Sequence, residues 1–235
     1  MHIGFIVDGN RRWAKEKNLP TLKGHQKGLE KVEMVIEELA KTAEVKFATF
    51  FLFSTENWNR TKEEVDYLMA LLNQKVISLA EKMQRNNVKC LVLGSKNNIP
   101  PKVQAGLNKA EEITKDCTGL TACICFNYGG KLEIADAAKS LASCVHAKLG
   151  PCPTADQLDQ YFTVENFEKH LYHPEVPACD MIVRTSGEER ISGFMLWRAA
   201  YAEFLFLKKY FPDIEAEDVK NILKEYQNRH RRFGK

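Results

Sequence analysis

The sequence predicts an α/β fold of one domain over residues 1–235, with a mostly parallel sheet of about six strands flanked by helices. Three observations support this prediction. Short apolar runs alternate with longer amphipathic stretches along the whole chain, as is typical of parallel sheets. The 235 residues suffice for one well-buried domain, and no low-complexity segment divides them. Polar clusters follow several apolar runs, where ligands bind in open α/β sheets.

Strand and helix patterns alternate through the first half of the chain. Residues 3–7 form a short apolar run that predicts a buried strand, and turn-like residues follow it. The segment 22–41 has apolar residues at helical spacing, whereas the β-branched and aromatic run 45–53 predicts a central strand. Thr61 and Glu64 are typical of a capping box, which begins a long helix extending to about residue 85.

The second half continues the same alternation. Prolines and glycines mark several junctions, and Thr154 with Gln157 is typical of a second capping box. The last predicted helix is acidic at its start and basic at its end, as the helix dipole favours. The pattern predicts strands at 88–93, 120–126, 180–184 and 202–207, and helices at 101–115, 130–147, after Thr154 and at 215–232.

Composition excludes several classes of protein. The formal net charge is only +3, too small for the strong basic field typical of nucleic-acid binding. The 7 cysteines form no CxxC pair and no spacing typical of zinc, so we expect reduced, structural thiols. No signal-peptide pattern precedes Asp8, and no apolar run approaches the roughly 20 residues that span a bilayer. We therefore expect a cytoplasmic protein.

Polar clusters follow strand-like runs at residues 8–12, 54–60, 127–130 and 184–192. In the first cluster, glycine permits close approach of the backbone to phosphate, and asparagine and arginine donate hydrogen bonds. Asp8 cannot bind phosphate directly, which indicates a divalent cation between the two. The fourth cluster carries arginines suited to a pyrophosphate clamp, whereas the third is also consistent with a simple turn. GxxxxGK[ST] and GxGxxG are both absent from the sequence.

These clusters belong to a longer ordered set of motifs. The set comprises residues 8–14 (DGNRRWA), 24–25 (GH), 53–60 (FSTENWNR), 127–130 (NYGG), 184–192 (RTSGEERIS), 196–197 (LW), 201–203 (YAE) and 231–234 (RRFG). With these motifs the sequence resembles the cis-prenyltransferases, the undecaprenyl and dehydrodolichyl diphosphate synthase family. The aspartate-rich DDxxD of trans-prenyltransferases is absent. The double arginine Arg11-Arg12 and the Ser-Gly-Glu of the fourth cluster resemble eukaryotic members.

The resemblance implies a reaction and its substrates. Isopentenyl diphosphate is condensed repeatedly onto an allylic diphosphate such as farnesyl diphosphate, each new double bond is cis, and pyrophosphate is released. The product would be a polyprenyl diphosphate, the precursor of a dolichol or undecaprenol sugar carrier. Charge builds on the leaving pyrophosphate, so the reaction needs preorganised donors and Mg²⁺. An apolar channel must receive the growing chain, and the stripe on the long helix 61–85 could form its wall.

The resemblance also implies roles for individual residues. Asp8 would bind Mg²⁺ and assist diphosphate departure, with Glu203 as a second metal-associated carboxylate. Asp8, His25, Ser54 and Asn57 are the expected catalytic residues, and Asn57 and His25 would lie near the proton that leaves. The allylic diphosphate would be held by Gly9, Asn10, Arg11 and Arg12, and isopentenyl diphosphate by Arg184, Arg190 and Ser192. Further substrate-binding residues would be Trp13, Trp58 and Arg60, of which Trp58 and Arg60 would line the junction between the two substrates.

Structural explanations compete with some of these roles. His25 could be an ordinary helix-start residue, Trp58 a core aromatic, and Glu203 a carboxylate at a strand start. Two departures from the family pattern also bear on function. Thr21 stands where many members have an arginine, so Lys23 or Arg11 would have to supply that phosphate contact. Leu52 stands where longer-chain synthases commonly have alanine, which predicts a narrowed channel, whereas Ala122 is permissive.

The C-terminal Arg232 and Gly234 resemble a family motif that reaches the neighbouring site across a dimer interface. We therefore expect a self-sufficient homodimer. A lipid product implies that the protein contacts a membrane peripherally. In a eukaryotic member, this contact would be on the cytosolic face of the endoplasmic reticulum. Two alternatives remain open at this point: a catalytically silent cis-prenyltransferase-like subunit that stabilises an active partner, and a phosphate-loop protein acting on soluble nucleotides.

Overall fold

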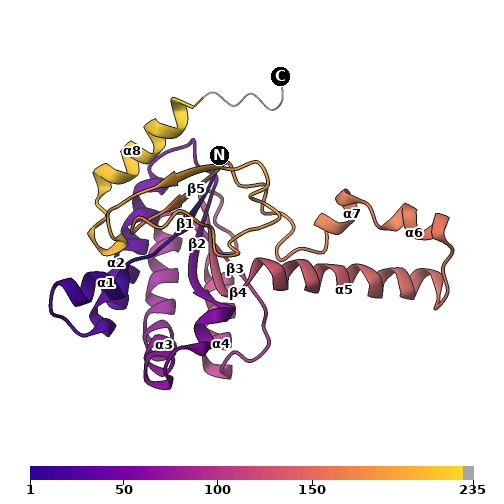
Figure 1. Ribbon diagram of the computed structural model, residues 1–235, viewed down its shortest axis with the longest axis horizontal. Helices are drawn as coiled ribbons and strands as arrows, with labels where there is room; N and C mark the ends of the chain where they lie inside the picture. Colours follow the sequence, from indigo (N-terminus) through magenta and orange to yellow (C-terminus); the bar gives the residue numbers. More distant parts are fainter. Residues whose placement is uncertain (230–235) are drawn as a thin grey trace.

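The computed structural model describes residues 1–229 and has a six-stranded sheet at its centre (Figure 1). The strands run in the order β3-β4-β2-β1-β5-β6, and every pair is parallel. This confirms the predicted fold class. The strands are β1 (His2–Ile6), β2 (Phe47–Ser54), β3 (Lys89–Leu93), β4 (Thr121–Tyr128), β5 (Met181–Arg184) and β6 (Glu203–Phe206).

Helices of very different length connect the strands. They are α1 (Asn10–Glu16), α2 (Thr21–Ala40), α3 (Lys62–Arg85), α4 (Pro101–Thr114), α5 (Gly130–Leu149), α6 (Ala155–Tyr161), α7 (Val164–Glu168) and α8 (Ala216–Gln227), with 3₁₀ turns η1 (Thr55–Asn59) and η2 (Phe211–Asp213). The capping box predicted at Thr154 and Gln157 is confirmed at the start of α6. The last helix ends at Gln227, earlier than predicted, and the short α7 was not predicted.

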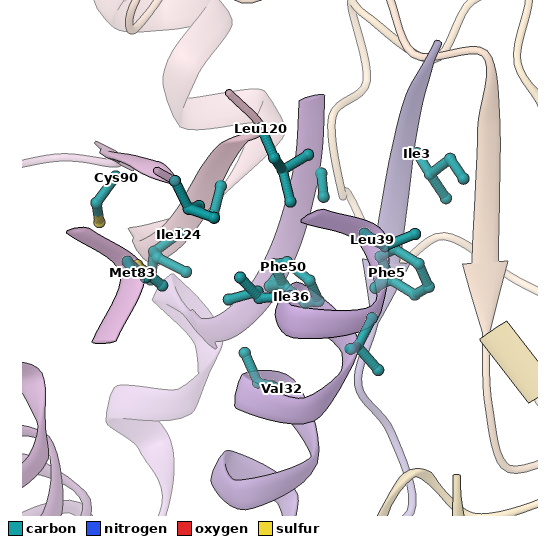
Figure 2. Packing of buried hydrophobic residues seen from close by; sticks show 14 of the residues in the cluster. Ile3, Phe5, Val32, Ile36, Leu39, Phe50, Met83, Cys90, Leu120 and Ile124 are labelled. Carbon is teal, nitrogen blue, oxygen red and sulfur yellow. The ribbon is translucent and has the colours of Figure 1, made fainter. Parts of the chain in front are cut away.

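Each face of the sheet is buried by a different kind of chain segment. On one face, side chains of α2, α3, α4 and α8 pack against the strands, with Val32 and Ile36 of α2 over Phe5 and Phe50 (Figure 2). On the other face, the core includes Phe194 and residues from 172–179 and 191–202, segments in which no helix is assigned. Burial on both faces explains why the strands are apolar runs without alternation.

The region after β1 is helical, although the sequence predicted only turn residues there. Gly9 has a positive φ of 102° and precedes α1, whose first residues are Asn10, Arg11 and Arg12. Helix α1 packs against α2 at Gly24 and Gly28, where any Cβ would lie within 2.0 Å and 2.5 Å of Asn10 atoms. This close contact stabilises a helix of seven residues, which would be marginal by itself. The two arginines therefore project from a rigid helical turn.

Strand order reverses between β1 and β5. The chain passes from β1 to β2 on one side of β1, whereas β5 pairs with β1 on its other side. A reversal of this kind leaves a crevice beyond the carboxyl ends of the two strands, and ligands bind in such crevices. The clusters at residues 8–12 and 184–192 follow β1 and β5, so the topology brings them together.

His2 provides a test of the buried sheet, because its imidazole is only 1% exposed. Its Nδ1 contacts the carbonyl oxygen of Pro177 at 3.0 Å, and its Nε2 contacts Thr49 Oγ1 at 2.7 Å. Burial lowers the pKa of His2 from 6.5 to about 4. The unfolded chain therefore binds the proton more readily, and stability should fall as pH falls from 6.5 toward 4, by about 3 kcal/mol at most.

Urea unfolding at several pH values tests this expectation. His2→Gln should lose the part of the pH dependence between pH 6.5 and 4 that His2 causes, whereas replacing the exposed His146 by Gln should leave it unchanged. An NMR titration in which the His2 ring becomes charged near pH 6.5 would contradict the assignment.

Candidate active site

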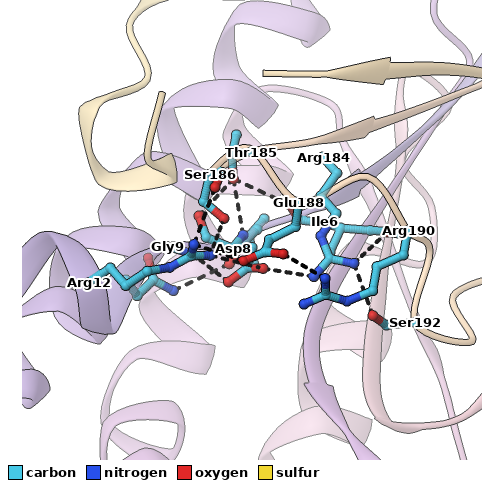
Figure 3. Close-up of polar contacts among 12 residues, drawn as sticks. Ile6, Asp8, Gly9, Arg12, Arg184, Thr185, Ser186, Glu188, Arg190 and Ser192 are labelled. Atoms are coloured by element: carbon cyan, nitrogen blue, oxygen red, sulfur yellow. Dashed lines mark hydrogen bonds and ion pairs between the residues drawn. The ribbon is translucent and has the colours of Figure 1, made fainter. Parts of the chain in front are cut away.

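Asp8, which follows β1, and Arg184, at the end of β5, are joined by polar contacts (Figure 3). Arg184 Nη2 donates a hydrogen bond of 2.8 Å to Asp8 Oδ2. Thr185 joins the two loops, because its hydroxyl donates to the carbonyl oxygen of Asp8 at 2.7 Å and accepts from the Asp8 amide at 3.1 Å. These contacts join residues 176 or 177 positions apart, so they depend on the strand order.

Asp8 is ionised in this setting. Partial burial raises its pKa, but hydrogen bonds from Arg184 and from the Gly9 amide, together with the charge of Arg12, outweigh that effect. The net result is a pKa below the usual value. The side chain of Asp8 is 33% exposed, so the carboxylate is accessible from the crevice.

The three residues predicted to bind isopentenyl diphosphate lie together. The side chain of Arg184 is only 5% exposed, and its Nη1 donates to Ser192 Oγ at 2.9 Å and to the carbonyl oxygen of Arg190. Its Nε is buried without a hydrogen-bond partner among the residues described. The guanidinium of Arg190 is 61% exposed and can therefore turn toward an anion.

Glu188 links the two arginine groups. Its Oε1 accepts from Arg12 at 2.8 Å, and its Oε2 accepts from Arg190 at 2.6 Å (Figure 3). Arg12 also donates to the side-chain and main-chain oxygens of Ser186. The single negative charge of this carboxylate is shared between two guanidinium groups, so the three side chains together stay positively charged. A bound diphosphate would compete with Glu188 for the same donors.

A polar pocket of about 650 Å³ opens beside Asp8. The pocket is lined by Thr21, which is uncharged and stands where many family members have an arginine. Two positive charges come instead from Arg11 and Lys15, both on α1. Lys23, the other predicted substitute for the family arginine, donates to Gln26 instead. The lining residues are Asp8, Gly9, Asn10, Arg11, Arg12, Lys15, Leu19, Pro20, Thr21, His25 and Arg60.

A buried carboxylate, Glu64, lies next to the floor of this pocket. Its Oε1 contacts His25 Nε2 at 3.0 Å and accepts from Arg60 Nη1 at 2.9 Å. The amide of Glu64 donates to the Thr61 hydroxyl, which caps α3. The side chain of Glu64 turns toward His25 and Arg60 instead of back to Thr61. Between Thr61 and Glu64, therefore, only one half of the predicted capping box forms. Sequence reasoning missed this role of Glu64, because the capping-box pattern already explained the residue.

An apolar cavity adjoins the polar pocket at Asn10 and His25, which line both. The Oδ1 atom of Asn10 is buried without a hydrogen-bond partner among the described residues. The cavity holds about 70 Å³, and a second one of about 20 Å³ lies deeper between α3 and the sheet. Leu52 lines both cavities, whereas Ala122 lines neither of these two.

Some predicted residues lie in the walls behind the pocket rather than on its surface. The amide of Ser54 donates to Asn57 Oδ1 at 3.1 Å, which anchors the turn η1. Trp58 packs edge-on against Phe53, and its indole donates to Asn127 Oδ1 at 2.7 Å. The contacts of Trp58 thus fit its structural explanation.

Trp13 is likewise engaged by the fold. Its ring is 9% exposed, and its indole donates to Asp213 Oδ1 at 2.6 Å. Asn127 is also structural: it has a positive φ of 49°, and its amide donates to the carbonyl oxygens of Ser95 and Asn97. The cluster at 127–130 therefore holds the neighbouring loop.

Glu203 is the first residue of β6, whereas Asp8 follows the last residue of β1, so the two lie at opposite ends of the parallel strands. Glu203 aligns in register with Met181, which aligns with Ile3. It therefore lies level with Ile3, five residues before Asp8, or about 16 Å away along the strand direction. Its carboxylate accepts from Arg229 at 3.0 Å. One chain therefore does not bring Glu203 and Asp8 to the same ion. The predicted Arg232 and Gly234 lie outside the described residues.

The donor set fits Mg²⁺ held jointly by protein and substrate. Within residues 1–229 no group of three or more histidine, cysteine, aspartate or glutamate side chains could hold a metal ion. Mg²⁺ commonly uses one or two carboxylates and completes its shell with substrate phosphates and water. Asp8, ionised and accessible at the edge of a cationic pocket, matches that pattern.

Within the described part of the chain, no helix is long and apolar enough to cross a membrane. The longest helix, α3, has 24 residues but carries charged side chains throughout.

Comparison with known proteins identifies the family to which this chain belongs. A family model described as putative undecaprenyl diphosphate synthase matches residues 6–234. The chain belongs to this family. It is 42% identical over 234 residues to an isoprenyl transferase of Thermotoga maritima, covering 99% of this chain and 96% of the relative. The family predicted from the sequence motifs is thereby confirmed.

Further relatives differ in their named substrates. The chain is 38% identical over 233 residues to a ditrans,polycis-undecaprenyl-diphosphate synthase of Micrococcus luteus, named as specific for (2E,6E)-farnesyl diphosphate, covering 99% of this chain and 90% of the relative. A crystal structure of lavandulyl diphosphate synthase from Lavandula x intermedia, in complex with dimethylallyl diphosphate, superposes with a TM-score of 0.90 at 30% identity, covering 100% and 98% of the two chains. The two named curated relatives are bacterial, and a eukaryotic origin stays a prediction.

Proposed function

We propose that this member of the family elongates cis-prenyl chains, condensing isopentenyl diphosphate onto an allylic diphosphate. The observation that best supports this proposal is the junction at Asn10 and His25, where a cationic pocket meets an apolar cavity. A diphosphate with an isoprenoid tail has the same division into a charged head and an apolar tail. Burial of that tail is favourable by about 0.8 kcal/mol per CH₂ group.

In this proposal the allylic diphosphate occupies the polar pocket. The amide groups at the start of α1 and the side chains of Arg11, Arg12 and Arg60 surround the head group. Because the fold holds these donors in place before substrate binds, they would stabilise the negative charge that develops on the leaving pyrophosphate. Asp8 would hold Mg²⁺ against the diphosphate. When bound, the ion offsets part of the developing negative charge.

Isopentenyl diphosphate is assigned to Arg184, Arg190 and Ser192, on the other side of Asp8. Glu188 would release Arg12 and Arg190 as the two diphosphates bind. In the proposed arrangement one diphosphate would lie on each side of the same carboxylate, and the two reacting carbons would meet next to the apolar cavity. Proximity of two bound reactants supplies much of the rate enhancement in such condensations.

We assign the product to the polycis-polyprenyl diphosphates, which serve as precursors of dolichol or undecaprenol sugar carriers. Farnesyl diphosphate is our preferred primer, since the Micrococcus luteus relative is named for it. A cytoplasmic location with peripheral membrane contact, at the endoplasmic reticulum in a eukaryotic host, follows from the lipid product and stays a prediction. The alternative is a silent subunit that stabilises an active partner.

A prenyl-transfer assay on the purified chain tests the proposal. The chain is incubated with farnesyl or geranylgeranyl diphosphate, labelled isopentenyl diphosphate and Mg²⁺, and butanol-extracted products are sized. Extractable products longer than the primer are expected, and EDTA should abolish them. No turnover by the chain alone, with activity only after a partner is added, would favour the silent subunit. A single condensation without further elongation would contradict chain elongation.

A homodimer is proposed as the active form. Glu203 lies on the edge strand β6, far from Asp8 of its own chain, and the motif containing Arg232 and Gly234 follows α8. A second copy could supply these residues to the neighbouring site. Deleting residues 232–235 should lower turnover about tenfold or more while leaving the melting temperature unchanged, because the deleted residues come after Gln227, where α8 ends.

Deleting Lys235 alone is the matched control, since it retains Arg232 and Gly234. Sedimentation velocity should report twice the chain mass for all three proteins. Full activity after removal of residues 232–235, or a monomer with full activity, would argue against the dimeric site.

A further inference from the structure

Glu64 is a buried carboxylate that is not itself a substrate contact in the proposed function, although it pairs with two of the proposed ligands, Arg60 and Arg11. It is 7% exposed, at the start of α3, and is enclosed by groups from three segments: His25 of α2, Arg60 before α3, and Arg11 of α1 at 3.9 Å. A buried carboxylate is costly unless it is paired and hydrogen-bonded. The Thr61 cap uses only the Glu64 amide, so the fold does not need a carboxylate here for helix initiation.

The contact with His25 determines which ring nitrogen carries hydrogen. Burial and the charges of Arg60 and Arg11 lower the pKa of His25, and they outweigh the opposite effect of Glu64, so the ring is neutral near pH 7. The pKa of Glu64 is also lowered, so the carboxylate is ionised and can only accept a hydrogen bond. The hydrogen of the neutral ring must therefore lie on Nε2, which is 3.0 Å from Glu64 Oε1.

The other nitrogen of the ring, Nδ1, keeps its lone pair. Within residues 1–229 it makes no hydrogen bond, although His25 is 9% exposed. The ring borders both the polar pocket and the apolar cavity. The unprotonated nitrogen thus belongs to a side chain located where the diphosphate head and the isoprenoid tail of a substrate would meet.

We propose that Glu64 is a positioning residue that holds His25 in the Nε2–H tautomer, so that Nδ1 accepts the proton released during condensation. This inference rests on the proposed function. The C1–O bond of the allylic unit breaks, and its electron pair leaves with pyrophosphate. As C4 of the isopentenyl unit bonds to that allylic carbon, a C–H bond at C2 of the isopentenyl unit breaks. Its electron pair becomes the new double bond, and the proton forms an N–H bond at Nδ1. Glu64 then contacts the positively charged imidazolium.

The charges around His25 suit a group that takes up a proton and then releases it. Glu64 stabilises the charged ring, whereas Arg60 and Arg11 destabilise it. The group therefore returns to the neutral form after each condensation. Activity should require neutral His25, so turnover should fall as pH falls through the pKa of this ring. Removing Glu64 should lower that pKa and move the acid limb of the rate profile to lower pH.

Two substitutions separate the role of Glu64 from packing. Glu64→Ala removes the acceptor and should reduce kcat roughly 10- to 100-fold, with a smaller change in KM. Glu64→Gln keeps an acceptor oxygen and should retain the Nε2–H tautomer and more of the activity. Glu63→Ala, at the exposed neighbouring position, is the control and should behave as wild type. Melting temperatures establish that each variant is folded.

The tautomer is measured directly by long-range ¹H–¹⁵N NMR of the chain without substrate. Wild type and Glu64→Gln should show hydrogen on Nε2 of His25, and Glu64→Ala should show a mixture of both tautomers. An Nδ1–H ring in wild type would overturn the proposal, as would an unchanged tautomer and an unchanged acid limb in Glu64→Ala. Absence of prenyl transfer by wild type would refute the proposed function, while the NMR measurement would still decide how Glu64 holds His25.

Discussion

Asp8→Asn is expected to lose nearly all prenyl-transfer activity, at least about 100-fold, equivalent to roughly 2.7 kcal/mol of activation free energy. Asparagine has the shape of aspartate but lacks its charge. It can still accept the hydrogen bond from the Gly9 amide, but it cannot balance Arg184 or hold Mg²⁺ against a diphosphate. The measurement is kcat for isopentenyl diphosphate incorporation at saturating Mg²⁺.

Asp8→Asn is preferable to Asp8→Ala, because alanine would leave the buried guanidinium of Arg184 with an empty space beside it. Asp66→Asn, on the exposed face of α3, is the matched control and should retain full turnover. Circular dichroism should show folded protein in both cases. Retention of more than about a tenth of the wild-type rate, roughly 1.4 kcal/mol, would refute a metal-side role for Asp8.

Leu52→Ala is expected to lengthen the products. Leu52 lies on β2 where the register with β4 is irregular, and its side chain lines both the 70 Å³ cavity and the 20 Å³ cavity. Truncating it should join the two spaces and let an isoprenoid tail pass further along α3. The products formed from farnesyl diphosphate are compared by mass spectrometry, and the whole distribution should shift by several isoprene units.

Leu68→Ala is the control for Leu52→Ala. Leu68 lines the upper cavity and is not among the residues of the lower one, so its truncation enlarges one space without joining both. Its product distribution should stay close to that of wild type. If Leu52→Ala and wild type give the same products, Leu52 is not a steric limit and product length is set elsewhere.

Much of the candidate site was predictable from local patterns. Asp8, Arg184 and His25 were identified because polar residues followed apolar runs or belonged to family motifs. The distance of Glu203 from Asp8 was also predictable. In a parallel sheet, a carboxylate at the start of one strand lies at the other end of the sheet from residues that follow strand ends. Lys15 lies one helical turn after Arg11 and is predictable once that segment is known to be helical, but the residue types of the segment indicate a turn.

Other features could not be read from the sequence, for physical reasons. The stability of α1 depends on Gly24 and Gly28, which lie on a different helix and allow it to approach. The pairing of Glu64 with His25 joins residues 39 positions apart. The capping pattern at Thr61 is a local signal, and a local signal carries no information on which distant group a side chain will contact.

Periodicity and residue types along the chain are enough to predict the alternation of strands and helices, the fold class, and the charged clusters at strand ends. These follow from periodicity and from residue types, which act over a few neighbouring positions. The pairing of β5 with β1 is visible only in three dimensions. This pairing brings Arg184 to Asp8, whereas Glu203 lies at the end of the sheet where the strands begin. Strand order depends on the packing of many distant side chains at once, and no short stretch of sequence contains that information.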